Sequence, residues 1–339
     1  MKTSFNRRFA VALTLLALAV CANGVTPAHA ATFMVTNLDN SGAGSLRDAI
    51  MAANAAPGAD TITFSVSGTI TLGSTLPTIT DTAGLTIDGT GQTVTISGAY
   101  LYQVLFVEAY ASLTLDNLTI ANGYNISGGG IANNGGTLTI TNCTFSGNSA
   151  ISTGGGIYTL GGSLTITNST FSDNTAISSG GGIFGLFGET MTITNSTFSG
   201  NSAGSLGGAI STVLFTANLL NTIVANSPSG GNCSAWIFNG GNNIDDGTTC
   251  GWGSTDGSMS NTDPSLGALV DNGGPTQTFA LLPGSPAIDG VTFNAPNGAP
   301  ATDQRGWIRP IDSDLDGTPL FDIGAYEKTI DLFLPLIMR

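Results

Sequence analysis

The acidic segment at residues 312–317 has the spacing of a calcium loop. Asp312, Asp314 and Asp316 stand at alternate positions before a glycine, and carboxylates at positions one, three and five of such a loop surround a hard cation. The twelfth position is an isoleucine in place of the usual glutamate, and Asp322 stands one residue before it. A solvated acidic turn is the competing interpretation. Calcium is the one cofactor that the sequence indicates.

Asp245 and Asp246 form the second group that could do chemistry. Two carboxylates that flank a glycosidic bond serve as acid and base in glycoside hydrolysis, whereas a lyase reaction needs an Arg or Lys base such as Arg305. A corner stabilised by Asx turns explains the aspartates equally, and an ion pair with Asp303 explains Arg305. The leading interpretation therefore assigns no catalytic residue. Asp245, Asp246 and Arg305 belong to the alternative in which the chain is an enzyme.

Residues 1–30 have the three parts of a secretory signal peptide. Basic residues precede an apolar run, and a cleavage site of the Ala-x-Ala type follows. Cys21 leaves lipoprotein processing open as an alternative. We expect a secreted or surface-attached protein whose mature chain starts at Ala31.

Cleavage before Ala31 would remove His29, the only histidine of the chain. A Ser-His-Asp triad, a Cys-His pair and an imidazole-ligated metal site are then excluded. Cleavage also removes three of the eight basic residues and none of the 22 acidic ones, so the formal net charge moves from −14 to −17. Because nucleic-acid binding needs a basic footprint, we expect no nucleic-acid partner. Beyond the signal, no apolar stretch is long enough to span a membrane.

Three cysteines remain after the signal peptide. Cys143 occupies a position that is serine in the sister repeats, so we expect a buried, unpaired thiol. Cys233 and Cys250 flank a turn-rich segment, and in a secreted protein this arrangement predicts a disulfide that closes a loop.

Residues 128–201 contain one pattern three times: Gly-Gly-Gly-Ile, then Leu or Met followed by Thr-Ile-Thr-Asn, then Phe-x-x-Asn. A fourth copy begins at Gly207, and the first glycines are 26, 26 and 27 residues apart. A fixed period indicates stacked units, and the alternation of apolar and polar residues is typical of strands with one buried face. The simplest fold is all-β: a single-stranded parallel β-helix of about five to seven coils at this repeat length. Its expected hand is right.

Stacking places equivalent side chains about 4.8 Å apart. We therefore expect an interior stack of phenylalanines, two ladders of asparagine amides and a row of outward threonines. In that order these are Phe145, Phe171 and Phe198; Asn142, Asn168 and Asn195; Asn148, Asn174 and Asn201; and Thr139, Thr165 and Thr192.

A short helix is expected near the start of the mature chain, with Ser45 as its N-cap and one apolar face. Such a helix can cover the exposed end of a β-helix. Its apolar face consists of Leu46, Ala49, Ile50 and Ala53.

The expected domain order follows from these features. It is a signal peptide at 1–30, an N-terminal cap at 31–60, β-helix repeats at 61–226, a C-terminal region that continues the β-helix at 227–327, and a tail at 328–339. The tail is interpreted either as a last strand or as a sorting signal.

Two features before residue 211 carry family resemblances. Residues 33–64 resemble the CSLREA-type segment of secreted bacterial β-helix proteins, with Gly44 in place of the usual cysteine. The repeated Gly-Gly-x-Ile and Phe-x-x-Asn motifs resemble those of the polymorphic outer-membrane-protein family of adhesins.

Residues 232–327 resemble the choice-of-anchor Q domain, and this resemblance has the most specific motifs. It implies a secreted or surface-attached β-helix protein with no established reaction. The motifs are NNID at 242–245, DPSLG at 263–267, DNGGPT at 271–276, LLPGSPAID at 281–289, TDQRG at 302–306 and DIGAYE at 322–327.

These observations favour a non-catalytic surface protein, monomeric and adhesin-like, that binds polysaccharide, cell-surface glycan or matrix. The alternative is a carbohydrate-active enzyme of the pectin lyase-like fold, a glycoside hydrolase or polysaccharide lyase, that uses aspartates with or without calcium. Ice binding through the row of outward threonines is a third interpretation, for which three coils provide only a small surface.

Overall fold

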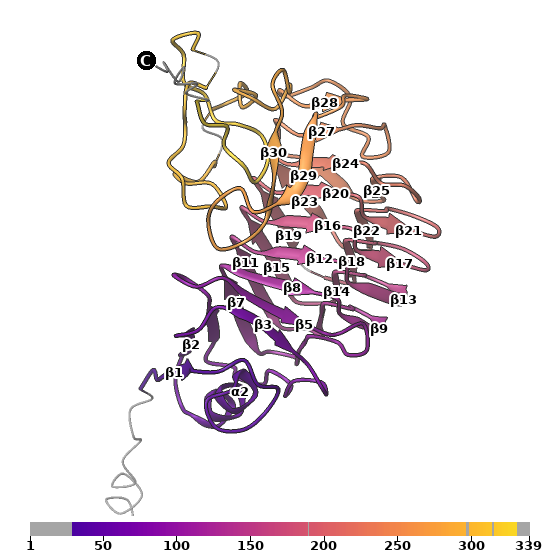
Figure 1. Ribbon diagram of the computed structural model, residues 1–339. Helices are drawn as coiled ribbons and strands as arrows, with labels where there is room; N and C mark the ends of the chain where they lie inside the picture. Colours follow the sequence, from indigo (N-terminus) through magenta and orange to yellow (C-terminus); the bar gives the residue numbers. More distant parts are fainter. Residues whose placement is uncertain (1–28, 189, 296–297, 314, 331–339) are drawn as a thin grey trace, which may run out of the picture.

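The chain winds into a right-handed parallel β-helix of about eight turns (Figure 1). The structure is a computed structural model that describes residues 29–188, 190–295, 298–313 and 315–330. The expected fold class is confirmed, and the expected count of five to seven coils is slightly low; sheet A also takes in β1, which lies within the expected cap. Residues 1–28 of the expected signal peptide and residues 331–339 of the expected tail lie outside the described residues.

Sheet A runs the length of the β-helix and has one strand in nearly every coil. Its inward side chains, such as Ile140 and Ile166, pair in register and are fully buried. Its outward row consists of threonines in seven successive strands, from Thr32 to Thr192. The strands are β1 (Thr32–Val35), β2 (Asp60–Phe64), β4 (Leu85–Asp88), β7 (Ser112–Asp116), β11 (Thr137–Thr141), β15 (Ser163–Thr167), β19 (Thr190–Thr194), β23 (Ala217–Leu220) and β26 (Ile237–Asn239).

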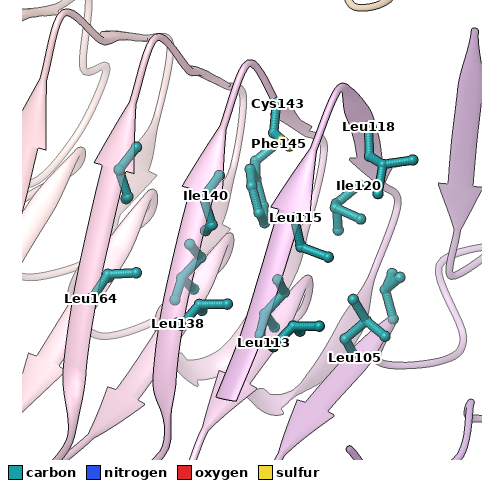
Figure 2. Close-up of a cluster of buried hydrophobic side chains, with 14 of the residues drawn as sticks. Leu105, Leu113, Leu115, Leu118, Ile120, Leu138, Ile140, Cys143, Phe145 and Leu164 are labelled. Carbon is teal, nitrogen blue, oxygen red and sulfur yellow. The ribbon is translucent and has the colours of Figure 1, made fainter. Parts of the chain in front are cut away.

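Sheet B forms a second wall of the coils. Its inward row holds the predicted aromatic stack: the ring centroids of Phe145 and Phe171 are 4.7 Å apart, and those of Phe171 and Phe198 are 4.6 Å apart. Figure 2 shows Phe145 beside the aliphatic residues that fill the interior. The strands are β3 (Gly68–Thr71), β5 (Val94–Ser97), β8 (Leu118–Ala121), β12 (Thr144–Ser146), β16 (Thr170–Ser172), β20 (Thr197–Ser199), β24 (Ile223–Ala225), β27 (Ile244–Asp245) and β28 (Met259–Ser260).

Two smaller sheets close the coils. At the entry to sheet C, a Cβ on Gly155 would lie 2.3 Å from the carbonyl oxygen of Thr175, so the close approach of adjacent coils requires glycine there. Sheet C contains β6 (Leu105–Val107), β10 (Ile131–Asn133), β14 (Ile157–Leu160), β18 (Ile183–Leu186), β22 (Ile210–Val213) and β25 (Cys233–Ser234); sheet D contains β9 (Tyr124–Ser127), β13 (Ser149–Thr153), β17 (Thr175–Ala176) and β21 (Ser202–Ala203).

The ladder of Asn148, Asn174 and Asn201 is confirmed. Each amide is fully buried, and each side-chain nitrogen of the first two donates to the side-chain oxygen of the next residue at 2.9 Å. The same nitrogens also donate to backbone carbonyls of the preceding coil. The ladder therefore satisfies the polar groups of a corner that water does not reach.

The second predicted ladder is corrected in part. Asn142, Asn168 and Asn195 all have positive φ, from +46° to +52°, and this left-handed conformation suits asparagine at a tight corner. Their amides do not bond to one another: Asn142 donates to Asp116, and Asn168 donates to the carbonyl of Thr302. Further along the same corner an amide ladder does form, because Asn221 donates to the side-chain oxygen of Asn195 and Asn242 donates to that of Asn221, both at 3.2 Å.

Helix α2 (Leu46–Ala55) covers the first coil as expected. Ser45 is the N-cap, and its hydroxyl accepts a hydrogen bond from the backbone N–H of Asp48 at 3.2 Å. The four residues of the predicted apolar face are the four buried residues of the helix. Figure 1 shows the helix at the N-terminal end of the coil stack.

The C-terminal region departs from expectation. The β-helix continues only as far as β28. The described residues after 262 (263–295, 298–313 and 315–330) then fold back against the outer face of sheet B and include a hairpin of β29 (Leu266–Val270) and β30 (Thr278–Leu281). The outward threonines of sheet B hold this layer: Thr144 donates to the carbonyl of Gln277, and Thr170 donates to the side chain of Gln304. Within the described part of this region, β29 and β30 pair only with each other and add no strand to the parallel sheets.

Candidate functional site

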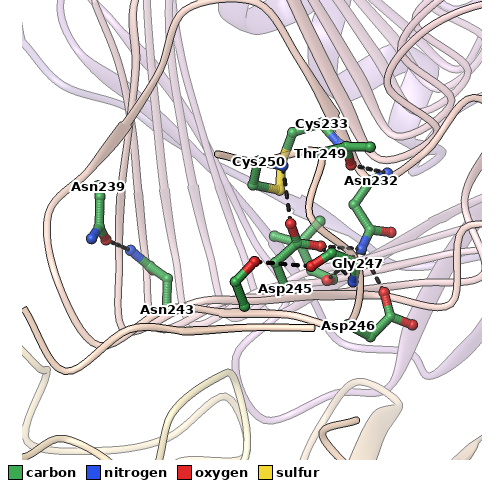
Figure 3. Close-up of a disulfide and its surroundings, with 11 residues drawn as sticks. Asn232, Cys233, Asn239, Asn243, Asp245, Asp246, Gly247, Thr249 and Cys250 are labelled. Carbon is green, nitrogen blue, oxygen red and sulfur yellow. Dashed lines mark hydrogen bonds between the residues drawn. A yellow bond between two sulfur atoms is a disulfide. The ribbon is translucent and has the colours of Figure 1, made fainter. Parts of the chain in front are cut away.

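The disulfide between Cys233 and Cys250 is confirmed, with the two Cα atoms 4.7 Å apart (Figure 3). It joins β25 to the loop after β27 and so fastens the last coils. Cys143 is buried and unpaired, and burial raises the pKa of its thiol to about 12. A thiol with this pKa stays protonated and unreactive at neutral pH.

Asp245 lies in the interior of the last coils. It pairs with Val224, next after Phe198 in the inward row of sheet B, and its side chain is fully buried. Its carboxylate accepts hydrogen bonds from the backbone N–H groups of Gly247 at 2.9 Å and Cys250 at 3.0 Å. The carboxylate therefore closes the corner that carries the disulfide (Figure 3).

Asp246 also accepts hydrogen bonds within this corner. Its two oxygens accept from the backbone N–H of Asn226 at 2.8 Å and from the side chain of Asn232 at 2.5 Å. Asn232 donates to Asp245 as well, at 2.6 Å. All three groups are engaged in fastening one coil to the next.

Arg305 lies in the layer outside sheet B, not beside the aspartate pair. Its guanidinium contacts Asp303 at 2.7 Å, donates to the carbonyl of Glu327 and lies 3.7 Å from the ring centroid of Tyr326. The neighbouring Gln304 bonds to β12 and β16, and β16 is three strand spacings from β27, roughly 14 Å. Asp245 faces inward and Arg305 lies outside, so the structure does not bring them together.

Three carboxylates and two arginines are buried together in this layer. Arg309 lies 3.6 Å from Glu327 and donates to the backbone carbonyls of Asp322 and Gly324. Burial and the nearby Glu327 raise the pKa of Asp322 to about 8, and burial raises the pKa of Glu327 to about 6. These ion pairs and hydrogen bonds hold the chain near Asp303 against the chain near Glu327. Nothing in the sequence alone indicated this structural role for Arg309 or Glu327.

A groove lies over sheet B at the edge of the C-terminal layer. The loop between β29 and β30 forms one wall, and Thr95 of β5 and Thr119 of β8 form the floor. A cavity of about 230 Å³ there adjoins a second of about 260 Å³, and the two share Thr93, Gly274 and Pro275. The lining consists of Ser67, Gly91, Gln92, Thr93, Thr95, Thr119, Asp271, Gly274, Pro275, Thr276 and Gln277.

Hydrogen bonds to neighbouring segments fix the wall of the groove in place. The backbone carbonyl of Gln277 accepts a hydrogen bond from Thr144, and the hydroxyl of Thr276 donates to the carbonyl of Asn142 at 3.0 Å. Gln304 donates to Thr276 at 2.9 Å. A wall fixed in this way needs little ordering when a ligand binds.

The groove could not be predicted from the sequence. Thr95 and Asp271 are far apart along the chain and lie in segments of different character, an irregular early coil and an unrepeated loop. The DNGGPT motif at 271–276 carries a family resemblance, but only the folded layer shows that this loop stands beside Thr95 and Thr119 of sheet B.

Comparison with known proteins agrees with this fold. A family model described as a right-handed beta helix region matches residues 78–249, slightly more than half of the 339 residues. The chain belongs to the right-handed β-helix family. The comparison with curated proteins found no match to this chain.

Among solved structures, this β-helix protein is similar to jun a 1, the major allergen from cedar pollen. The identity is 17%, the TM-score is 0.34, and the match covers 64% of each chain, less than two thirds of the allergen's length. At this level the likeness says nothing about activity.

A calcium site at residues 312–322 stays a prediction. Asp314 lies outside the described residues, and Asp322 is turned away, since its carboxylate accepts from the backbone N–H groups of Asp289 at 2.7 Å and Lys328 at 2.5 Å. Asp312 accepts from the N–H of Gly317 within the loop at 3.0 Å. Among the described residues no three His, Cys, Asp or Glu side chains gather as a metal site. Calorimetric titration of chelator-treated β-helix protein with calcium would decide it, since absence of heat rejects the site.

The outward threonines of sheet A extend further than the three that the repeats predicted. Thr139, Thr165 and Thr192 lie in a row of seven, and none of these three hydroxyls has a hydrogen-bond partner among the described residues. Ice binding through this row stays a prediction, and unchanged ice recrystallisation in the presence of the protein would reject it.

Within the described ranges, no helix is long and apolar enough to cross a membrane.

The buried cluster predicts an unusual dependence of stability on pH. The pKa values of Asp322 and Glu327 are raised on folding, so their stabilising contribution is complete below the unfolded values near 4 and is lost as pH rises through about 6 and then about 8. Each extra bound proton gives a slope of about 1.4 kcal/mol per pH unit. We expect denaturant unfolding to show lower stability at pH 9 than at pH 5.

The variant Asp322→Asn provides the check on this dependence. An amide cannot ionise, so the fall in stability between pH 6 and pH 9 should become shallower than in the parent protein. An equally steep fall in the variant would show that other groups cause it.

Proposed function

We propose that this protein is a secreted or cell-surface β-helix protein that binds a glycan chain in the groove beside the β29–β30 loop and does not cleave it. The observation that supports this most directly is the lining of the groove. It presents the threonine hydroxyls of sheet B, the glutamine amides of the adjoining loops and one ionisable side chain, Asp271. Hydroxyl and amide groups on a preformed surface suit the hydroxyls of a sugar chain.

The same lining argues for binding over catalysis. Glycoside hydrolysis needs two carboxylates on opposite sides of the scissile bond, and Asp271 has no second carboxylate opposite it among the described lining residues. Elimination needs a basic group, which this lining also does not provide. The alternative of a carbohydrate-active enzyme therefore depends on Asp245, Asp246 and Arg305. The side chains of these three residues already form hydrogen bonds with other groups of the protein.

The proposed location at the cell surface rests on other features. The N-terminus has the pattern of an export signal. The families that the chain resembles, with their CSLREA-type segments, adhesin repeats and choice-of-anchor Q domains, are families of exported proteins. The acidic net charge of −14 keeps a rod of uncharged coils soluble and fits a partner that is not a nucleic acid. We propose a monomer that presents the groove to glycans of another cell or of a matrix.

Binding and cleavage can be measured together on a panel of soluble polysaccharides, with calcium present. The proposal expects retention on at least one polysaccharide and no release of reducing ends. Thr95→Tyr should fill the groove and weaken binding by about ten-fold or more, since one well-placed side chain can block a site. Thr165→Tyr is the matched control, because Thr165 faces outward on sheet A. Release of reducing ends, or equal weakening by both variants, would contradict the proposal.

A further inference from the structure

We infer that the groove selects neutral or amine-bearing glycans and rejects polyuronates. This inference rests on the proposed function, because it specifies the ligand of the same groove. Three features of the groove support it: the charges in and around the groove, the hydroxyls in it that form no hydrogen bond within the described residues, and the position of Asp271.

The groove carries negative charge only. Asp271 is exposed, and one of its oxygens accepts a hydrogen bond from the backbone N–H of Gly273 at 2.9 Å, as in an Asx turn. Its other oxygen has no hydrogen-bond partner among the described residues, so it is open to a ligand. The whole chain has a formal net charge of −14, so the surrounding field adds to this local charge.

The basic residues of the described chain are placed elsewhere. Arg47 donates to the backbone carbonyls of Asn40 and Ser74 near the cap, and Arg305 and Arg309 are buried in the C-terminal cluster. Lys328 lines a different cavity, beside Ile288. A uronate chain brings one carboxylate with each sugar, and none of these cations is available in the groove to pair with it. Repulsion between like charges therefore disfavours polyuronates.

A neutral chain meets groups that are ready to bind it. The hydroxyls of Thr95 and Thr119 and the side-chain amide of Gln277 make no hydrogen bond within the described residues, while the Gln277 backbone is fixed by Thr144. Pro275 adds an apolar surface for the C–H face of a sugar ring. Hydroxyl and amide groups both donate and accept, so they match sugar hydroxyls without a charge.

An amine on the sugar gains an additional interaction. The open oxygen of Asp271 can accept a charge-assisted hydrogen bond from an ammonium group, which is stronger than a bond between neutral groups. The structure thus predicts an order of affinity in which amino-sugar chains exceed neutral chains and polyuronates come last.

Calorimetry with three oligosaccharides of equal length tests this order: deacetylated chitooligosaccharide, its N-acetylated counterpart and oligogalacturonate. We expect the deacetylated chain to bind about ten-fold more tightly than the acetylated one at low salt, the effect of one charge-assisted hydrogen bond. Oligogalacturonate should show no measurable binding. Oligogalacturonate binding as tightly as the other two would overturn the inference and leave the proposed function standing. Failure of all three to bind would contradict the proposed function itself.

Asp271→Asn isolates the role of the carboxylate. The variant should lose the preference for the deacetylated chain and keep its affinity for the acetylated one. Asp263→Asn is the matched control, because Asp263 is also exposed and also accepts from the N–H two residues later, at 2.8 Å, but does not line the groove. A preference that survives in Asp271→Asn, or that disappears equally in Asp263→Asn, would overturn the assignment to Asp271.

Discussion

The variant Arg305→Leu is expected to lose about 3–5 kcal/mol of stability, the usual cost of removing one partner from a buried ion pair. Arg305 is 7% exposed and Asp303 is fully buried, so the substitution leaves a carboxylate without its cation. It also removes the donor to Glu327 and the contact with Tyr326. Unfolding in denaturant, followed by tryptophan fluorescence, measures the loss, and Trp307 beside Arg305 reports on this layer.

Arg47→Leu serves as the control for Arg305→Leu. The two substitutions are chemically identical, but Arg47 donates to backbone carbonyls and an asparagine at the partly exposed cap and makes no ion pair within the described residues. Its cost should be about 1 kcal/mol, close to that of ordinary hydrogen bonds. Equal losses for the two variants would contradict the structural role given to the Asp303 pair.

The variant Phe171→Ala is the second large effect, also expected at about 3–5 kcal/mol. Its ring is fully buried between Phe145 and Phe198, with interplanar angles of 4° and 8°. Removing the ring leaves a cavity that two rigid neighbours on adjacent coils cannot collapse to fill. Thermal and denaturant unfolding measure the effect.

Ile177→Ala tests the specificity of that result. Ile177 belongs to the same repeat as Phe171 but is 69% exposed, so its truncation should change stability by no more than about 0.5 kcal/mol. A loss from Ile177→Ala comparable with that from Phe171→Ala would mean that the stack is not in the core.

The sequence was most informative where residues repeat. The period near 26 residues placed Phe171 directly between two other phenylalanines and Asn174 between two other asparagines, because equivalent residues of stacked coils must be neighbours. Alternation within each strand assigned Thr165 to the outer surface. The N-cap at Ser45 was also predictable, since capping depends only on residues close in sequence.

The sequence was least informative where contacts join unrepeated segments. The contact between Thr144 and Gln277 spans 133 residues and follows from no period, so the fold-back of the C-terminal layer and the groove at its edge were not predicted. Asp245 illustrates the converse problem. Its type allowed acid-base chemistry, but only the structure shows that its oxygens are taken up by Gly247, Cys250 and Asn232.

The central claim is that a glycan chain binds in the groove on sheet B and is not cleaved there. A crystal structure of the protein with the tightest-binding oligosaccharide of the panel tests it most directly. The account predicts an intact chain within hydrogen-bonding distance of Thr95, Thr119 and Gln277, with the β29–β30 loop unmoved. A chain on the threonine row of sheet A, or a cleaved product beside Asp245 and Asp246, would contradict it.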